Sequence, residues 1–208
     1  ARAVDISHGI HNDWFLGGVF QGAYPQIVLD DLDPHMPAGW QDEMPIISTP
    51  VDWLGVNYYS RGIMSANQLP GAMWPHVIHH RGSLPRTQMG WEIYPDGLYQ
   101  TLKRIAGSYS GCTPIYITEN GMASDDTVIN GEVADDVRLA YLNDHINAVA
   151  RAADEGVPMR GYFAWSLLDN FEWSFGYEKR FGLVHVDYDT MVRTPKASYY
   201  ALKAAIHS

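Results

Sequence analysis

Three nearly continuous apolar runs limit most strongly what this chain can fold into. The runs cover residues 51–59, 113–119 and 159–167, and a proline stands within one residue of the start of each. Strands that are buried on both faces of a parallel sheet have this composition, whereas strands with one wet face alternate between apolar and polar residues. We therefore predict three buried parallel strands.

Helical patterns follow each of the predicted strands. They occupy residues 95–107, 134–156 and 195–208. Asp135 and Asp136 lie near the N-terminal end of the second helix, where the helix dipole favours negative charge. The order strand, helix, strand, helix, strand, helix predicts βαβ units in an α/β fold. The residues that we expect on the buried side of the second helix are Leu139, Leu142, Ile146, Val149 and Ala153.

A sheet of only three such strands leaves two apolar edges, which proteins normally pair or cover. We therefore expect the chain to be part of a larger closed structure, either a (β/α)8 barrel or a doubly wound sheet. The first residues, "ARAVDISHGIHNDWF", carry no initiating methionine and no cap or turn signal. This start favours the interpretation that the chain is a fragment.

Composition narrows the classes of partner and compartment. Apolar residues make up 46% of the chain and charged residues 18%, which indicates a packed core. A formal net charge of −10 disfavours binding to nucleic acid or to an anionic membrane surface. Cys112 is the only cysteine, so no intrachain disulfide can form, and with no signal-peptide pattern in view we expect a cytoplasmic protein.

Polar or aromatic side chains close each apolar run. The carboxyl ends of parallel strands meet at one edge of the sheet, where α/β folds bind their ligands. Taken singly, each of these residues has an ordinary explanation, since Glu-Asn-Gly is also turn chemistry and a tyrosine or tryptophan is often a core aromatic. Their agreement on three strands favours a site. The residues are Asn57, Tyr59, Glu119, Asn120, Trp165 and Ser166.

Other chemistries find little support in the sequence. The nine histidines show no metal-ligand spacing, and the pair His79–His80 is more typical of a solvated loop tip. The sequence contains no Gly-rich phosphate loop and no Gly-x-Ser-x-Gly motif. We therefore expect no metal and no cofactor.

Five motifs occur in an order that resembles glycoside hydrolase family 1, the β-glucosidase family. They are "LGVNYYSR", "GWEIYP", "TENG", "GYFAWSLLDNFEW" and "KRFGLVHVDY". The resemblance runs from about Trp14 to the C-terminal helix. It implies a (β/α)8 TIM barrel of retaining glycosidases, in which the three predicted strands correspond to strands 6–8. Residues 1–208 are then a single segment, the C-terminal portion of the catalytic barrel.

The resemblance also implies catalytic roles. Glu119 corresponds to the nucleophile, Tyr59 to the residue that donates a hydrogen bond to it, and Asn57 to a residue that positions the sugar's 2-hydroxyl. Retaining enzymes need a second carboxyl group about 5–5.5 Å from the nucleophile. The family carries that acid/base glutamate in an Asn-Glu-Pro motif, which is absent from this chain. We therefore expect it on a missing N-terminal barrel segment.

Substrate-binding roles follow from the same resemblance. Trp165 corresponds to the platform beneath the sugar ring, with a cis peptide bond expected between Trp165 and Ser166. Glu172 and Trp173 correspond to residues that bind the 4- and 6-hydroxyls of the sugar. The presence of this pair argues against 6-phospho sugars as substrates. The remaining two expected contacts are Phe181 near the 6-position and Trp91 on the aglycone side.

The resemblance predicts a retaining β-glucosidase that releases glucose from the non-reducing end of β-glucosides or cello-oligosaccharides, as in cellulose degradation. A preference for β-galactosides or β-fucosides is one alternative. Because the acid/base residue is missing, an inactive sugar-binding half-barrel fragment is another.

Overall fold

The computed structural model describes residues 2–64, 82–110 and 113–206. The chain divides into two compact units, which are considered separately here. The first unit comprises residues 1–52, 62–83 and 104–113, and the second comprises residues 53–61, 84–103 and 114–208. No helix in the described residues is both long enough and apolar enough to cross a membrane.

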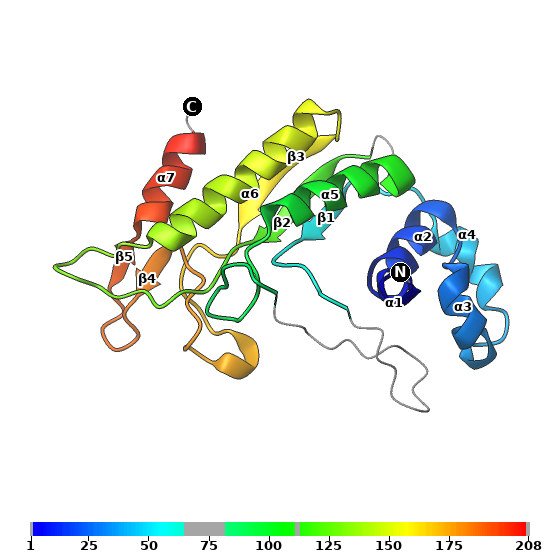
Figure 1. Ribbon diagram of the computed structural model, residues 1–208, viewed down its shortest axis with the longest axis horizontal. Helices are drawn as coiled ribbons and strands as arrows, with labels where there is room; N and C mark the ends of the chain where they lie inside the picture. The colour runs from blue at the N-terminus through cyan, green and yellow to red at the C-terminus, as the bar shows by residue number, and fades with distance from the viewer. Residues whose placement is uncertain (1, 65–81, 111–112, 207–208) are drawn as a thin grey trace. The chain divides into compact units, whose positions relative to one another are not determined.

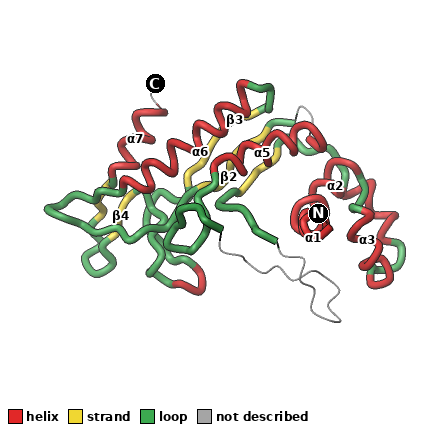
Figure 2. Tube along the Cα trace, in the orientation of Figure 1, coloured by secondary structure: helices red, strands yellow, loops and turns green. Residues whose placement is uncertain are grey.

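The first unit is helical in its described part (Figures 1 and 2). Sequence analysis assigned no elements to this region beyond a start inside one. The helix that begins at Arg2 passes through a π-helical turn and ends at Gln21, where Gly22 takes up a left-handed conformation with φ 62°. The elements are α1 (Arg2–His8), η1 (Gly9–Asp13), α2 (Trp14–Gln21), α3 (Gln26–Leu32), η2 (Asp33–His35), η3 (Trp40–Glu43), α4 (Met44–Ile47) and η4 (Ala106–Ser110).

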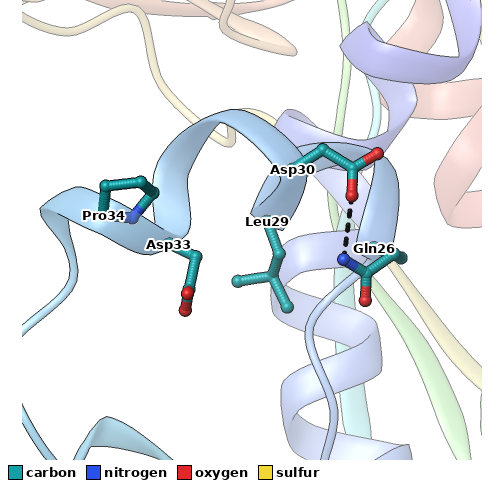
Figure 3. Close-up of a pocket in the computed structure, with 5 residues that line it drawn as sticks. All are labelled: Gln26, Leu29, Asp30, Asp33 and Pro34. Carbon is teal, nitrogen blue, oxygen red and sulfur yellow. Dashed lines mark hydrogen bonds between the residues drawn. The ribbon is translucent and has the colours of Figure 1, made fainter.

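A shallow hollow lies beside α3 in this unit (Figure 3). Its polar groups are engaged locally, because Gln26 donates a 2.8 Å hydrogen bond to Asp30 and the indole of Trp40 donates a 3.2 Å bond to Asp33. Leu29 and Pro34 complete the lining. The hollow therefore reflects the packing of short helical turns.

The second unit contains the predicted parallel sheet. Strands β1 (Leu54–Asn57), β2 (Ile115–Asn120) and β3 (Met159–Ala164) pair in the order β1-β2-β3, so β2 is the central strand. Each strand is shorter than the apolar run that predicted it, because only part of each run joins the ladder. The prediction of three parallel strands is confirmed.

Helices α5 (Pro95–Ile105) and α6 (Asp136–Asp154) lie along one side of this sheet (Figure 1). Their N-terminal ends match the predicted helices closely, and α7 (Ala197–Ile206) confirms the third. Packing between α6, β3 and α7 builds an apolar cluster around Met122, Leu142 and Leu183.

The predicted buried side of α6 was wrong by about one position. Leu142 is buried as predicted, but Ala153 is exposed, and Leu139, Ile146 and Val149 are only half-buried. Polar side chains can occupy the buried side where they find hydrogen-bond partners, although Nε2 of His145 has none among the described residues, and an apolar pattern does not reveal such side chains. The residues actually buried on α6 are Arg138, Tyr141, Leu142, His145, Ala148 and Ala152.

A small hairpin and a helical turn lie between β3 and α7. Strands β4 (Val184–Val186) and β5 (Arg193–Pro195) pair antiparallel, and η5 spans Trp173–Phe175. Three-residue strands are too short to produce a readable periodicity, which is why the sequence did not reveal them.

Candidate active site

Glu119 lies one residue before the carboxyl end of β2, the central strand. The pairing of β1 with β2 slips there: Val56 faces Ile117, but Asn57 faces Glu119, which leaves Thr118 as an extra residue in β2. Strict alternation would point Glu119 to the same side as the buried Ile117. A slip of this kind re-aims the side chains that follow it, and Glu119 is half-buried instead.

Tyr59 supplies the close partner of this carboxylate. Its hydroxyl donates a 2.6 Å hydrogen bond to Oε2 of Glu119. Burial, and then the bond to Glu119, raise the pKa of Tyr59 well above the ordinary tyrosine value, so the hydroxyl keeps its proton and remains a donor. The backbone is held as well, because the N–H of Tyr58 donates a 2.9 Å bond to the carbonyl of Glu119.

Asn57 lies opposite Glu119 in the strand register, and its side chain is exposed. Its Oδ1 accepts a 2.6 Å hydrogen bond from the hydroxyl of Thr118. The amide oxygen keeps a second lone pair and the amide nitrogen carries two N–H donors, so Asn57 can offer a ligand both an acceptor and donors.

Three aromatic rings gather beside the carboxylate. The rings of Tyr59 and Trp91 are 5.3 Å apart between centroids, and Phe181 lies 6.2 Å from each of them. Phe181 is buried, whereas Tyr59 and Trp91 are half-buried. The structure therefore brings together Trp91 and Phe181, which come from motifs 90 residues apart in the chain.

Trp165 follows β3, and its N–H donates a 2.9 Å bond to the carbonyl of Asn120 at the end of β2. The peptide bond between Trp165 and Ser166 is cis, which confirms that prediction. Gly121 makes this approach possible: a Cβ at position 121 would lie 1.9 Å from the carbonyl oxygen of Trp165.

Glu172 and Trp173 lie on the loop that carries η5. Glu172 is half-buried, and its charge is one of the influences that raise the pKa of Tyr59, after burial and the bond to Glu119. Trp173 is 81% exposed and adopts a left-handed φ of 44°. The structure therefore places Glu172 near the Tyr59–Glu119 pair and leaves Trp173 with little packing among the described residues.

The glutamate of the "GWEIYP" motif has a structural environment. Glu92 is 4% exposed and forms a 2.7 Å ion pair with Arg61. The hydrogen bond from Arg61 lowers the pKa of Glu92, and the backbone N–H of Leu84 adds a 3.2 Å bond. Glu92 thus fastens the segment that carries Trp91 to the end of β1.

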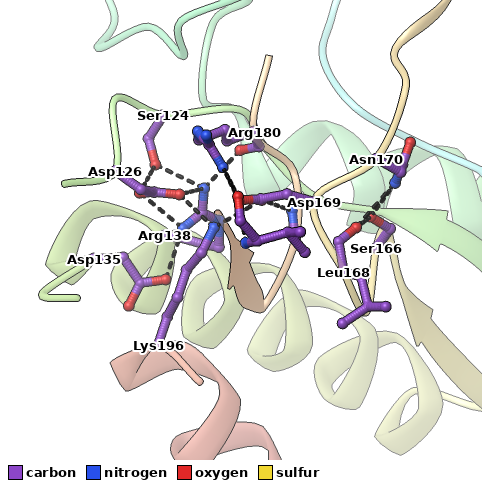
Figure 4. A network of polar contacts seen from close by, with 12 residues as sticks. Ser124, Asp126, Asp135, Arg138, Ser166, Leu168, Asp169, Asn170, Arg180 and Lys196 are labelled. Carbon is purple, nitrogen blue, oxygen red and sulfur yellow. Dashed lines mark hydrogen bonds and ion pairs between the residues drawn. The ribbon is translucent and has the colours of Figure 1, made fainter. Parts of the chain in front are cut away.

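Sequence analysis missed a buried ionic network near these strand ends, which balances three cations against three anions (Figure 4). It joins the loop after β2, the start of α6, the loop after β3 and the start of α7. The i,i+3 pair on α6 was the one local signal for it. The charged residues are Asp126, Asp135, Arg138, Asp169, Arg180 and Lys196.

Each buried cation in the network bridges two carboxylates. Arg138 lies 2.7 Å from both Asp126 and Asp135, and Lys196 bonds to Asp126 and lies 3.0 Å from Asp169. Burial alone raises the pKa of Asp126, but the bonds and charges of Arg138 and Lys196 outweigh it, so that pKa is lowered. The network thus holds the loop after β3 against the loop after β2.

The residues that the structure describes contain no group of three or more His, Cys, Asp or Glu side chains placed to hold a metal ion. The chemistry that the arrangement offers is a half-buried carboxylate with a short hydroxyl donor, lying among aromatic rings at the carboxyl ends of parallel strands. Such a carboxylate can act as a nucleophile or a base toward a ligand with flat apolar faces.

Comparison with known proteins places this arrangement in context. The whole chain, residues 1–208, matches the family described as Glycosyl hydrolase family 1. Beta-glucosidase A of Thermotoga maritima is 44% identical over 201 residues, which cover 96% of this chain and 44% of that protein. The bifunctional beta-D-glucosidase/beta-D-fucosidase of Bifidobacterium breve is 41% identical over 218 residues, covering 96% of this chain and 47% of its own length.

A solved structure is also similar to this chain over almost all of its length. The beta-glucosidase from Thermotoga maritima in complex with deoxynojirimycin is 42% identical with a TM-score of 0.92, covering 99% of this chain and 46% of that chain. The present chain therefore spans a little under half the length of these relatives.

Proposed function

The chain belongs to glycosyl hydrolase family 1, and from that premise we propose that it supplies the nucleophile side of a retaining β-glucosidase. One observation carries the proposal. At the carboxyl end of the central parallel strand, Glu119 accepts a 2.6 Å hydrogen bond from the protonated hydroxyl of Tyr59. A carboxylate held in this way is oriented and adjacent to aromatic rings, as a glycosidase nucleophile needs to be.

The reaction proceeds in two displacements. An oxygen of Glu119 attacks the anomeric carbon, the bond from that carbon to the leaving oxygen breaks, and a second carboxylic acid gives its proton to the leaving oxygen. Water then attacks the glycosyl-enzyme and gives a proton to the same second carboxylate, and Glu119 is released with the anomeric configuration retained. The catalytic part of Tyr59 is to hold the carboxylate, and that of Asn57 is to position the 2-hydroxyl.

The second carboxyl group comes from a segment outside this sequence. We propose that residues 1–208 form one segment, the C-terminal portion of a (β/α)8 barrel, with β1, β2 and β3 as strands 6–8. Coverage of 44–47% of the relatives supports this arrangement. The open edges of β1 and β3 are where the remaining strands pair.

Glucose is the sugar that the site supports best. Trp165 lies beneath the ring, Glu172 and Trp173 bind the 4- and 6-hydroxyls, Phe181 lies near the 6-position and Trp91 contacts the aglycone. A carboxylate such as Glu172 attracts hydroxyl donors and repels a phosphate, which favours unphosphorylated β-glucosides or cello-oligosaccharides as substrates. The proposed role of the protein is cellulose degradation, and its proposed location is the cytoplasm. A bifunctional glucosidase/fucosidase among the relatives favours β-fucosides as the second candidate.

The test uses a completed protein, in which the part of Thermotoga maritima beta-glucosidase A outside the matched region is joined ahead of residue 1. We expect hydrolysis of p-nitrophenyl β-glucoside by the completed protein, with β-glucose as the first product. A 2-deoxy-2-fluoro-β-glucoside with a dinitrophenolate leaving group should label the peptide that contains Glu119. The chain without the added segment should not turn over p-nitrophenyl β-glucoside.

Glu119→Gln should abolish turnover because an amide cannot form the glycosyl-enzyme. Glu132→Gln is the matched control, since Glu132 is exposed and pairs with Ile129 through backbone groups alone. Retained turnover in Glu119→Gln would remove the proposed role. Sugar binding by the chain alone, with no labelling in the completed protein, would favour a non-catalytic sugar-binding fragment instead.

A further inference from the structure

We propose that the buried side chains of Asn120 and Tyr141 act as a positioning unit that sets where the Glu119 carboxylate stands. This inference rests on the proposed function of Glu119. Asn120 has been named above only among the polar residues that end the apolar runs, without a role of its own. Tyr141 has had no role, and it comes from α6, on the helix-covered side of the sheet.

Asn120 is fully buried, and its amide joins three other elements. Its Nδ2 donates a 2.7 Å bond to the carbonyl of Tyr58 after β1 and a 3.0 Å bond to the hydroxyl of Tyr141 on α6. Its Oδ1 accepts a 2.6 Å bond from the hydroxyl of Tyr162 on β3. The residue next to Glu119 is therefore fixed to both neighbouring strands and to a helix.

The hydroxyl of Tyr141 forms hydrogen bonds to Asn120 and to Tyr59, the two residues that fix the position of the Glu119 carboxylate. It accepts a bond from Asn120, which is joined to Glu119 by a peptide bond. It also donates a 3.3 Å bond to the backbone carbonyl of Tyr59, whose own hydroxyl holds Oε2 of Glu119. The buried hydroxyl oxygen of Tyr141 thus links Asn120 on β2, the residue after Glu119, to the backbone of Tyr59, which donates the hydrogen bond to Glu119.

Tyr141 itself is held tightly. It is 1% exposed, and the ring of His145 stacks on it with 3.9 Å between centroids and 26° between planes. Nδ1 of His145 donates a 2.7 Å bond to the Tyr141 carbonyl. Burial raises the pKa of Tyr141, so the hydroxyl remains protonated and available as a donor.

A phenylalanine at position 141 would fill the same space but would leave an N–H of Asn120 and the Tyr59 carbonyl without this partner. Nucleophilic attack depends steeply on the position of the attacking atom, and a misplacement of about 1 Å costs on the order of a hundredfold in rate. We therefore infer that the Tyr141 hydroxyl contributes to kcat as well as to stability.

The experiment measures kcat, KM and the rate of labelling by the fluoroglucoside in Tyr141→Phe of the completed protein. Tyr99→Phe is the control. It removes a tyrosine hydroxyl whose 2.7 Å bond goes to the carboxylate of Glu155, a residue outside the positioning unit. We expect kcat and the labelling rate to fall roughly tenfold in Tyr141→Phe with KM within about twofold, and to fall much less in Tyr99→Phe.

Equal losses of kcat in Tyr141→Phe and Tyr99→Phe would overturn the inference, since both would then reflect stability alone. If Tyr141→Phe does not fold, Tyr162→Phe removes a single bond to Asn120, and kcat should still fall with KM retained; an unchanged kcat there overturns the inference. Activity in Glu119→Gln would overturn the proposed function itself. An inactive Glu119→Gln beside a fully active Tyr141→Phe overturns only the positioning role.

Discussion

The hydroxyl of Tyr59 lies 2.6 Å from Oε2 of Glu119, although the two residues are 60 positions apart in the chain. Tyr59 follows β1 and Glu119 lies one residue before the end of β2, so the parallel pairing of two strands brings donor and acceptor together. The contact therefore depends on the register of the sheet, and it can be tested apart from the packing of the strands.

Tyr59→Phe in the completed protein should lower kcat by about tenfold to a hundredfold, because a hydrogen bond to a charged group contributes about 1.5–3 kcal/mol. Steady-state kinetics with p-nitrophenyl β-glucoside measures the effect. Tyr99→Phe is the control, since Tyr99 makes a 2.7 Å bond to the carboxylate of Glu155 on the outside of the helices. Equal kcat values for the two variants would contradict the importance of the Tyr59 contact.

Gly121→Ala should destabilise the protein by about 3 kcal/mol or more, because the new Cβ would overlap the Trp165 carbonyl oxygen and backbone cannot move aside easily. Urea unfolding of the completed protein measures the change. Gly107→Ala meets nothing within 4 Å and lies in a helical turn, so it should be neutral or slightly stabilising. Similar unfolding midpoints for both variants would show that the close approach at Gly121 is absent.

Lys196→Met should cost about 3–5 kcal/mol, because it leaves the buried carboxylates of Asp126 and Asp169 short of one cation. The same substitution at Lys103, whose ion pair with Glu155 is exposed, should cost less than about 1 kcal/mol. Denaturant unfolding of both variants provides the comparison. A small loss at Lys196 would mean that the network contributes little to the stability of the fold.

His145 predicts a specific dependence of stability on pH. Burial lowers its pKa from 6.5 to about 4, so the folded protein keeps this ring neutral while the unfolded chain binds a proton below about pH 6.5. The free energy of unfolding should therefore fall by about 3 kcal/mol between pH 6.5 and pH 4 through this group.

His145→Gln removes that titration and keeps a donor for the Tyr141 carbonyl. Thermal unfolding of the completed protein between pH 4 and pH 7 should show a flatter profile in this variant than in the unsubstituted protein. Parallel profiles would mean that the ring is already protonated or already exposed in the folded state.

Strands β1 to β3 and helices α5 to α7 could be predicted because each depends on a local pattern, whereas β4, β5 and η5 were too short to show one. The apolar composition of each run was enough to predict β1, β2 and β3 as buried strands. The candidate site residues were predicted from the motifs that contain them. The predicted role of every candidate site residue, Glu119 included, stays a prediction, because each of these roles concerns a ligand.

The remaining features depend on partners that are distant in sequence. The extra residue Thr118 in β2 arises only when β1 pairs with it, so no single run reveals which way Glu119 points. Arg138 and Lys196 look like surface residues until the carboxylates of three other segments surround them. The burial of Tyr141 and His145 on α6 was not predicted either, because it depends on specific hydrogen bonds that an apolar pattern does not reveal.

The placement of Glu119 on the middle strand has a consequence for how the protein moves. The central strand β2 pairs on both sides, with β1 and with β3, so its paired amides can exchange with deuterium only when the sheet separates. The loop that carries Trp173 has no such double restraint, because its backbone bonds stay within a short turn. We therefore predict faster deuterium exchange in that outer loop than in β2.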